Sequence, residues 1–399
     1  MGIKLLFLKS STVNICTASF NLLTTVLLVR WFGETVYADF IVDLAYLSLI
    51  SILLEIIPSN YSIFRVQDYP SRICGLAALS VVTVFILAGI AAASGYFFDL
   101  FHANSVWIAP YAGSLAVKRY LDTLLQSTGR LREYFGVELL GAAIRVVLMS
   151  GFLWWGVQPV DAVWASLACA TLLAQLFWFS KNAEERRVFI SSVVEKSAWI
   201  PLFEERRAYI PYYLGIFFKR LRDNLVPILA SYFFISKASL GAFFLAYRGL
   251  LFTAGQIRVI EGLLNHRKNL VAVEGLPFLH KIFVAAFGQI VCIAASFGLM
   301  FSSGVEKFQI FTILILSFAI WFYVFSIIER SKAYSRFDIS TVNLSIVSYC
   351  SVQIILVWFF KNMNIRTENV FGFILVCSEG VSLLTMVLSA KRKKLNTVK

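Results

Sequence analysis

Long apolar segments alternate with short polar connections along almost the whole chain. Each segment holds roughly 20 residues, the length that an α-helix needs to cross the hydrocarbon core of a bilayer. The segments are continuous apolar runs, which favours helices over a membrane β-barrel. With 59% hydrophobic residues, 15% charged residues and a mean hydropathy of +0.77, the chain carries more apolar surface than a soluble domain could bury.

The pattern predicts an all-α polytopic membrane protein with twelve spans. The expected spans are residues 5–29, 36–57, 73–97, 105–127, 136–157, 160–179, 208–234, 239–263, 280–301, 308–328, 339–360 and 369–389. The fourth, seventh and eighth carry charged residues, but omitting one would invert the charge balance of every later connection. The longest connection is charged and divides the spans six and six. The expected parts are a bundle at 1–179, a cytoplasmic linker at 180–207, a second bundle at 208–390 and a basic tail at 391–399.

The distribution of Lys and Arg sets the expected orientation. With the N-terminus in the cytoplasm, 23 of the 36 basic residues fall in cytoplasmic segments, 5 fall outside and 8 lie within spans. This bias is a strong positive-inside signal and places both termini in the cytoplasm. The net charge of +13 therefore reflects topology and internal cations. Because the cytoplasmic cations are dispersed over many segments, we expect no nucleic-acid partner, and the basic tail is expected to contact lipid headgroups.

The sequence offers no enzyme signature. Its six cysteines all fall within spans and form no CxxC pair, its three histidines are far apart, and no HExxH, P-loop or dinucleotide fingerprint occurs. We therefore expect no catalytic residue, no metal and no organic cofactor. Lys4 precedes an apolar run that could mimic a signal peptide, but polar residues interrupt this run and no small-x-small cleavage site follows. An uncleaved first helix is expected.

Cations inside the apolar spans are the main functional signal. A charged side chain at the bilayer centre costs about 2.5 kcal/mol or more, so such residues usually face a protein-lined, water-filled path. This much internal positive charge indicates that the protein handles an anion. The expected cavity cations are Arg119, Arg145, Lys219, Arg220, Arg222 and Arg248. Lys118 and Asp122 are spaced i,i+4 and can pair, which leaves Arg119. For Lys118 and Arg119, snorkelling to the cytoplasmic interface is an equal alternative. Arg258 and Glu261 suggest a local surface pair.

The seventh span concentrates these charges. Lys219 and Asp223 are spaced i,i+4 and can pair, so Asp223 is expected to be a structural counter-ion. Pro211 and Pro227 bracket the cluster and are expected to act as hinges, because each removes a backbone hydrogen bond. The alternative is that this stretch is an amphipathic cytoplasmic segment instead of a span.

Two further sets of polar residues lie within spans. On the first span, Asn14, Thr17, Asn21 and Thr24 share one helical face, which suits cavity lining and interhelical hydrogen bonding equally well. Asp43 and Glu379 are the acids deepest within spans. They could be counter-ions or proton sites, and Glu379 is the preferred candidate for coupling transport to H+ or Na+.

These residues carry a resemblance to a known family. The seventh and eighth spans read KRLRDNLVPILASYFFISKASLGAFFLAYRGL, a polar run with Asp223, a short turn, and an opening with Gly241 that ends in Ala246, Tyr247 and Arg248. Together with the span count, the six-plus-six division and the orientation, this resembles the Wzx-type O-antigen flippases. They are polysaccharide flippases of the multidrug/oligosaccharidyl-lipid/polysaccharide exporter superfamily.

The resemblance implies two six-helix bundles that face a central cavity and rock between inward-open and outward-open states. The implied function is translocation of an undecaprenyl-pyrophosphate-linked oligosaccharide, an O-antigen or capsule repeat unit for lipopolysaccharide or polysaccharide biosynthesis, across the bacterial inner membrane. Arg and Lys suit its pyrophosphate because they form charge-assisted hydrogen bonds. The implied partners are membrane lipids, a polysaccharide polymerase and a chain-length regulator.

Two other functions remain open. A cation-coupled drug or solute antiporter of the same superfamily should have an acidic cavity, whereas the cations dominate here. A membrane-embedded polysaccharide polymerase should carry a long outside catalytic loop, whereas the outside connections expected here are short and hold no paired acid and base.

The charge bias yields a topology prediction. Reporter fusions at Asn182, at His266 and in the tail should score as cytoplasmic, and fusions at Asn104, Gly304 and Asn362 should score as outside. One reversed pair would mean that a span has been miscounted.

Overall fold

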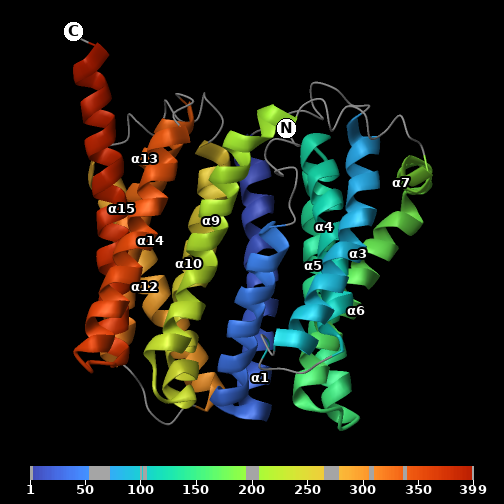
Figure 1. Ribbon diagram of the computed structural model, residues 1–399, viewed down its shortest axis with the longest axis horizontal. Coiled ribbons are helices and arrows are strands. Elements are labelled where there is room, and N and C mark those ends of the chain that lie inside the picture. The colour runs from blue at the N-terminus through green and yellow to red at the C-terminus, as the bar shows by residue number, and fades with distance from the viewer. Residues whose placement is uncertain are drawn as a thin grey trace. The chain divides into compact units, whose positions relative to one another are not determined.

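The computed structural model describes residues 3–53, 72–98, 101, 106–194, 206–264, 278–304, 310–335 and 339–397 (Figure 1). Within these ranges the secondary structure is helical, with short turns and no strand. The helices are α1 (Ile3–Leu53), α3 (Arg72–Phe98), α4 (Ile108–Ser127), α5 (Leu131–Trp154), α6 (Pro159–Lys181), α7 (Ala183–Val194), α9 (Arg206–Phe233), α10 (Lys237–Leu264), α12 (Phe278–Ser303), α13 (Ile310–Ser335), α14 (Ile339–Asn362) and α15 (Glu368–Thr397).

The expected all-α architecture is confirmed. Each expected span corresponds to a long helix or to one half of α1. In the described part of the chain, nine helices are long and apolar enough to cross a membrane. The two charged helices α4 and α9 fall outside that set, yet they have 20 and 28 residues. At 1.5 Å per residue, both reach roughly 30 Å or more, the thickness of the hydrocarbon core.

The first two expected spans are joined more tightly than the sequence suggested. Helix α1 runs from Ile3 to Leu53 with a single non-helical residue, Gly33, at φ 82° and ψ 169°. This backbone region is accessible almost only to glycine, because a Cβ atom would clash with the neighbouring peptide groups. The expected turn between residues 29 and 36 is therefore a break at one glycine.

Two further elements extend the sequence-based picture. The short helix α7 lies in the expected linker, which the sequence had marked only as a charged connection. Helix α15 continues to Thr397, so the backbone of the basic tail is helical up to that residue.

The chain divides into two compact units. The first unit comprises Met1–Ser11, Val29–Val42 and Phe218–Lys399, and the second comprises Thr12–Leu28 and Asp43–Phe217. Each unit therefore takes part of α1 and part of α9. The division into six-helix bundles at 1–179 and 208–390 stays a prediction.

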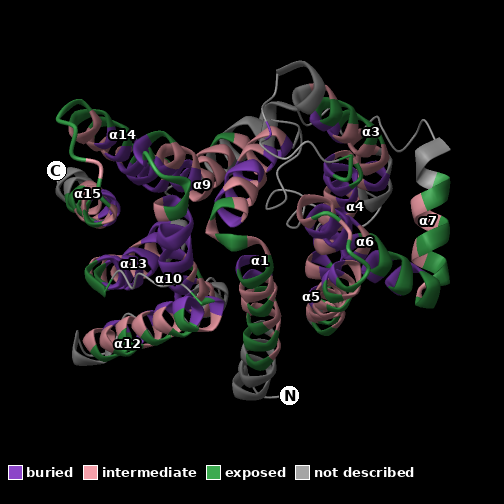
Figure 2. Ribbon diagram, turned by 90° about the horizontal axis from the view of Figure 1, so that it is seen from below, coloured by how far each residue is buried: buried purple, intermediate pink, exposed green. Residues whose placement is uncertain are grey.

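In the first unit, α10 packs against α12 and α13, and α15 packs against α13 and α14. Figure 2 shows the buried residues of α10 and α13 turned toward each other. Large apolar side chains such as Phe283 and Phe318 remain exposed on the outer sides of α12 and α13. In a bilayer these side chains contact lipid, which leaves the polar residues to gather inside the unit.

In the second unit, α4 packs against α3 and α6, and α5 packs against α6. A cluster of buried side chains that includes Leu121, Leu125 and Trp178 joins α4 to α6. On α3, Phe85 is exposed and suits contact with lipid.

Close helix crossings in the first unit depend on glycine. A Cβ atom on Gly249 of α10 would lie 2.0 Å from the Ser296 Oγ and 2.7 Å from the Ser296 backbone nitrogen on α12. A Cβ atom on Gly241 would lie 2.3 Å from the carbonyl oxygen of Glu34. The backbone cannot move aside as a flexible side chain can, so both positions exclude larger residues. Small residues at interfaces are a common means of helix association in membranes.

The crossing at Gly249 can be tested by overpacking. Gly249→Ala should destabilise the protein by about 1–3 kcal/mol, because the new methyl group meets the backbone of α12. Gly255→Ala is the matched control on the same helix, where a Cβ atom meets nothing within 4 Å. The control should be neutral or stabilising by about 0.5–1 kcal/mol. Thermal unfolding in detergent should show a lower Tm for Gly249→Ala alone, and equal Tm values would contradict the close crossing.

Candidate functional site

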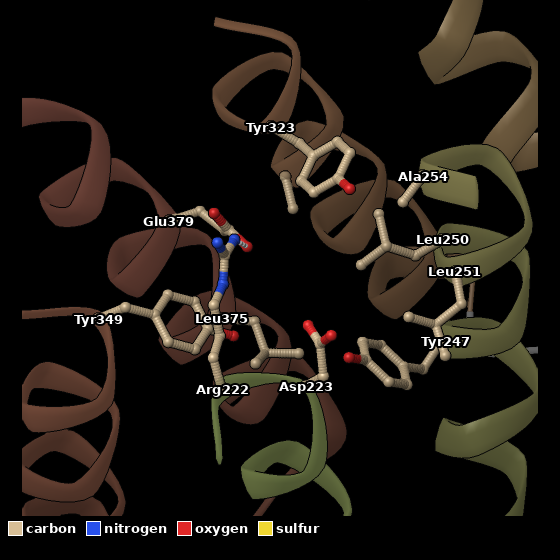
Figure 3. Close-up of a pocket in the computed structure, with 11 residues that line it drawn as sticks. Arg222, Asp223, Tyr247, Leu250, Leu251, Ala254, Tyr323, Tyr349, Leu375 and Glu379 are labelled. Atoms are coloured by element: carbon tan, nitrogen blue, oxygen red, sulfur yellow. Dashed lines mark hydrogen bonds and ion pairs between the residues drawn. The ribbon is translucent and has the colours of Figure 1, made fainter. Parts of the chain in front are cut away.

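A charged pocket lies within the first unit, among α9, α10, α13, α14 and α15 (Figure 3). Its polar lining residues are Arg222, Asp223, Tyr247, Tyr323, Tyr349 and Glu379. The cavity volume is about 50 Å³, which leaves room for a few water molecules. In this state the pocket is too small for a sugar.

An ion pair between Arg222 and Glu379 forms one wall of this pocket. The Arg222 side chain donates from Nη2 to the Glu379 Oε1, and the two residues are only 7% and 9% exposed. The guanidinium carbon also lies 4.7 Å from the ring centroid of Tyr349, within the range of a cation–π contact. Both charges are thus desolvated, and each depends on the other because an unpaired buried charge is strongly unfavourable.

The second oxygen of Glu379 and the carboxylate of Asp223 shape the rest of the pocket. The Glu379 Oε2 is buried and has no hydrogen-bond partner among the described atoms. Asp223 turns its carboxylate into the pocket, toward Tyr247 (Figure 3). The pocket therefore holds one cation and two acids, plus three phenol groups. Glu379 is the counter-ion of Arg222, one of the two roles that the sequence analysis left open for it. Its role in coupling, and the role of Asp223 as the counter-ion of Lys219, stay predictions.

A second charged cluster lies in the second unit, between α4 and α5. The expected i,i+4 pair of Lys118 and Asp122 is confirmed, with the Lys118 Nζ 3.0 Å from the Asp122 Oδ2. Lys118 also pairs with Glu138 of α5, a partner that the sequence analysis missed. The neighbouring Arg119 donates to the backbone oxygen of Ser51 at 2.9 Å and to its hydroxyl at 2.7 Å. These contacts attach the end of α1 to α4.

Arg145 meets the polar face of α1. Its Nη1 donates to the Asn21 Oδ1 at 3.0 Å, and the guanidinium remains partly exposed. On the same face, the Thr17 hydroxyl is buried without a hydrogen-bond partner in the described part of the chain. The Thr24 hydroxyl donates to the carbonyl of Phe20, 2.9 Å away in its own helix. The face thus combines interhelical hydrogen bonding with a half-exposed cation.

The remaining expected residues are distributed over both units. Arg248 of α10 donates from Nε to the Tyr37 hydroxyl at 3.3 Å. Arg220 is half-buried on α9, and its carbonyl accepts a hydrogen bond from Asn224. Asp43 is fully buried in α1.

Several expectations fall outside the described part of the structure. These concern the side chains of Asn14, Pro211, Lys219, Arg258 and Glu261. The pairing of Lys219 with Asp223 therefore stays a prediction. Pro227 is buried, and α9 continues through it to Phe233, so its role as a hinge also stays a prediction. In the ranges that the structure describes, no three His, Cys, Asp or Glu side chains gather as metal ligands would.

Outside the spans, Arg130 joins two helices of the second unit through hydrogen bonds. Arg130 donates from Nε and Nη2 to the Glu133 carboxylate, at 2.7 and 2.6 Å, and also donates to Glu185. The hydrogen bonds to Glu133, followed by the one to Glu185, raise the pKa of Arg130 above its ordinary value despite partial desolvation. This guanidinium therefore stays charged at any physiological pH and holds α5 and α7 together.

The buried pair can be tested by a double-mutant cycle. Glu379→Leu and Arg222→Met should each destabilise the protein by about 3–5 kcal/mol, because the surviving partner keeps an uncompensated buried charge. Arg222→Met combined with Glu379→Leu should recover much of this loss. Glu368→Gln, in the first turn of the same helix, is the control and should leave the Tm in detergent nearly unchanged. Additive losses in the double variant would contradict a direct pair.

Comparison with known proteins clarifies the fold. No protein-family model and no curated protein sequence matches the chain. A MATE transporter in complex with MaL6 superposes with a TM-score of 0.70 at 12% identity, covering 98% of this chain and 97% of that one. The lipid II flippase MurJ, in an inward closed conformation, superposes with a TM-score of 0.63 at 14% identity, covering 97% of this chain and 87% of that one.

A third structure is a transporter of the multidrug/oligosaccharidyl-lipid/polysaccharide (MOP) superfamily from Pyrococcus furiosus, whose binding pocket has reverse polarity that suggests a different function. It gives a TM-score of 0.62 at 12% identity over 97% of this chain and 95% of that one. At such low identity, a structural likeness establishes the fold alone. The chain is therefore an all-α, multi-pass membrane protein with the fold of the MOP superfamily transporters.

Proposed function

We propose that this protein is a flippase for an undecaprenyl-pyrophosphate-linked oligosaccharide, an O-antigen or capsule repeat unit, in the bacterial inner membrane. It would work by alternating access, with both termini in the cytoplasm. The transporter fold supports the class of activity, and one of the structures that share it is a lipid II flippase. The internal cations support an anionic, lipid-linked cargo.

The observation that carries the proposal is the contact between Arg145 and Asn21. It places a partly exposed guanidinium within the apolar span of α5, against the polar face of α1. Moving a pyrophosphate through hydrocarbon is prohibitive unless cations replace its water shell. A phosphate oxygen can take the place of the neutral Asn21 oxygen, because a charge-assisted hydrogen bond is roughly twice as strong as a neutral one. Asn21 and Thr17 would then be available to sugar hydroxyls.

The other internal cations fall into two groups by the side chains to which they are hydrogen-bonded. Arg222 and Lys118 are bonded to carboxylates, so we assign them a structural role. Arg248 contacts the neutral phenol of Tyr37, and Arg119 contacts Ser51. In the second unit we assign Arg145 to the phosphates, with Arg119 as a secondary candidate. In the first unit, Arg220 and Arg248 are the candidates for cargo contact, with Lys219 as a secondary candidate. The planar fork of arginine can grip two phosphate oxygens at once, which a lysine cannot do.

The pocket around Glu379 and Asp223 supports a role for a coupling ion. Its acids outnumber its cations, which is the feature expected of the alternative function as a cation-coupled antiporter. In a flippase the same pocket would serve as the place where H+ or Na+ acts. We expect membrane lipids, a polysaccharide polymerase and a chain-length regulator as partners, and no catalysis by this chain.

Replacing Arg145 tests the proposed cargo contact. Arg145→Gln should reduce export of the lipid-linked glycan by roughly ten-fold or more, because a charge-assisted hydrogen bond of about 1.5–3 kcal/mol is lost. Arg145→Lys should restore part of the activity, since the charge returns without the fork. The measurement is the share of lipid-linked glycan on each membrane leaflet, in cells with equal amounts of protein.

Arg132→Gln is the matched control, because Arg132 is an exposed arginine at the end of the same helix. It should export normally. Normal export by Arg145→Gln would contradict the proposed contact, and glycan found only outside in the absence of the protein would contradict the flippase.

A further inference from the structure

Helix α7 lies across the other helices of its unit. In Figure 1, α7 is seen nearly end-on, whereas α3, α4 and α5 run upright in the plane of the picture. Figure 2, turned by 90°, shows α7 along its length and α3, α4 and α5 nearly end-on. It packs mainly against α3 and follows α6 after one break, at Asn182. A helix transverse to the spans, directly beyond the end of one of them, is placed parallel to the membrane plane.

Buried contacts fix one face of α7 to the unit. The ring of Phe189 lies 5.0 Å from Tyr120 and 5.4 Å from Phe179, centroid to centroid. Arg130 bonds to Glu185 and donates to the Asn182 Oδ1 at 2.7 Å. These contacts determine which face of the helix turns outward, and they make α7 a fixed element of the unit.

The outward face carries a basic and apolar pattern. Arg186, Arg187 and Ile190 are all exposed, and Ile190 is 61% exposed. The spacings of four and three residues put both arginines one turn before Ile190, on the same side of the helix. Lys181, at the end of α6, adds a third exposed cation and lies 4.3 Å from the ring centroid of Phe177.

The apolar surface of α6 leads up to this basic face. Leu176 and Phe177 are exposed near the end of an apolar span, where they suit contact with acyl chains. The cations Lys181, Arg186 and Arg187 follow directly, at the depth where lipid headgroups lie. Glu184 is the one acid of α7 that is exposed in the structure, so the exposed charge from Lys181 to Arg187 sums to +2.

We propose that α7 is an anionic lipid binding site, with Arg186, Arg187 and Lys181 on headgroup phosphates and Ile190 in the acyl boundary. An interfacial helix with basic residues beside an apolar one has this arrangement, because the charges stay in the headgroup layer while the apolar side chain enters the lipid. The continuity with the lipid-facing surface of α6 favours a membrane lipid over a soluble protein as the occupant. This site is separate from the internal cations assigned to the cargo.

Photo-crosslinking of lipid probes to the full-length protein tests the proposal. The protein is reconstituted in phosphatidylcholine vesicles with either phosphatidylglycerol or phosphatidylcholine that carries a headgroup diazirine, and probe attached to the α7 peptide is quantified by mass spectrometry. The wild-type protein should prefer the anionic probe. Each basic residue near a membrane surface is worth about 1 kcal/mol, so R186Q/R187Q should lower the anionic-to-neutral ratio by roughly thirty-fold at low salt.

Three control variants separate the effect of the arginine charges from effects on folding and on the insertion of α7 into the lipid. R186K/R187K should keep the preference, because headgroup attraction depends mainly on charge, and E184Q should keep or increase it. I190D should reduce crosslinking of both probes, because a carboxylate replaces the apolar side chain that enters the acyl boundary. An unchanged ratio in R186Q/R187Q would overturn the proposal. So would an α7 that takes neither probe while Lys181 reacts freely with water-soluble amine reagents, an outcome that would indicate a soluble partner instead.

Discussion

The cost of placing charge in a membrane governs the interior of this protein. A guanidinium inside a bilayer needs an acceptor within hydrogen-bond reach, because no bulk water is available to solvate it. For Arg222 the acceptor is Glu379, with the ring of Tyr349 on one side. The pair joins α9 to α15 at the middle of the first unit, and the lining of the pocket is arranged around it. The stability of that unit and the chemistry of its pocket therefore depend on the same contact.

The same constraint explains the contacts of the cations in the second unit. Lys118 is held by two carboxylates, which fixes α4 to α5 and leaves its ammonium committed to the protein. Arg145 instead holds a neutral amide oxygen at the polar face of α1, a contact that a more strongly bound anion can replace. The flippase proposed above would need both kinds of cation, because its binding sites must release their cargo while the bundle around them keeps its shape. Outside the spans, Arg130 is likewise held by hydrogen bonds, and its contacts with Glu185 and Asn182 orient α7.

Much of the fold could be predicted from local sequence. Apolar runs of bilayer length located the helices, the i,i+4 spacing correctly paired Lys118 with Asp122, and the break at Gly33 falls where the first two spans were separated. The site was less accessible. Arg222 and Glu379 are 157 residues apart, and Arg145 and Asn21 are 124 apart, so no helical periodicity relates them. Glu138 was missed for the same reason, because its partner belongs to another helix.

The sequence by itself determined that the chain crosses the membrane many times as helices, with cations inside its spans, because hydrophobicity and helical periodicity are properties of neighbouring residues. Tertiary structure alone decided which cation is neutralised by which acid, since that depends on how helices from distant parts of the chain pack. It also turned α7 across its unit and brought Asp223 and Glu379 into one pocket. Charges act over a few ångströms in space, and only the packed helices define those distances.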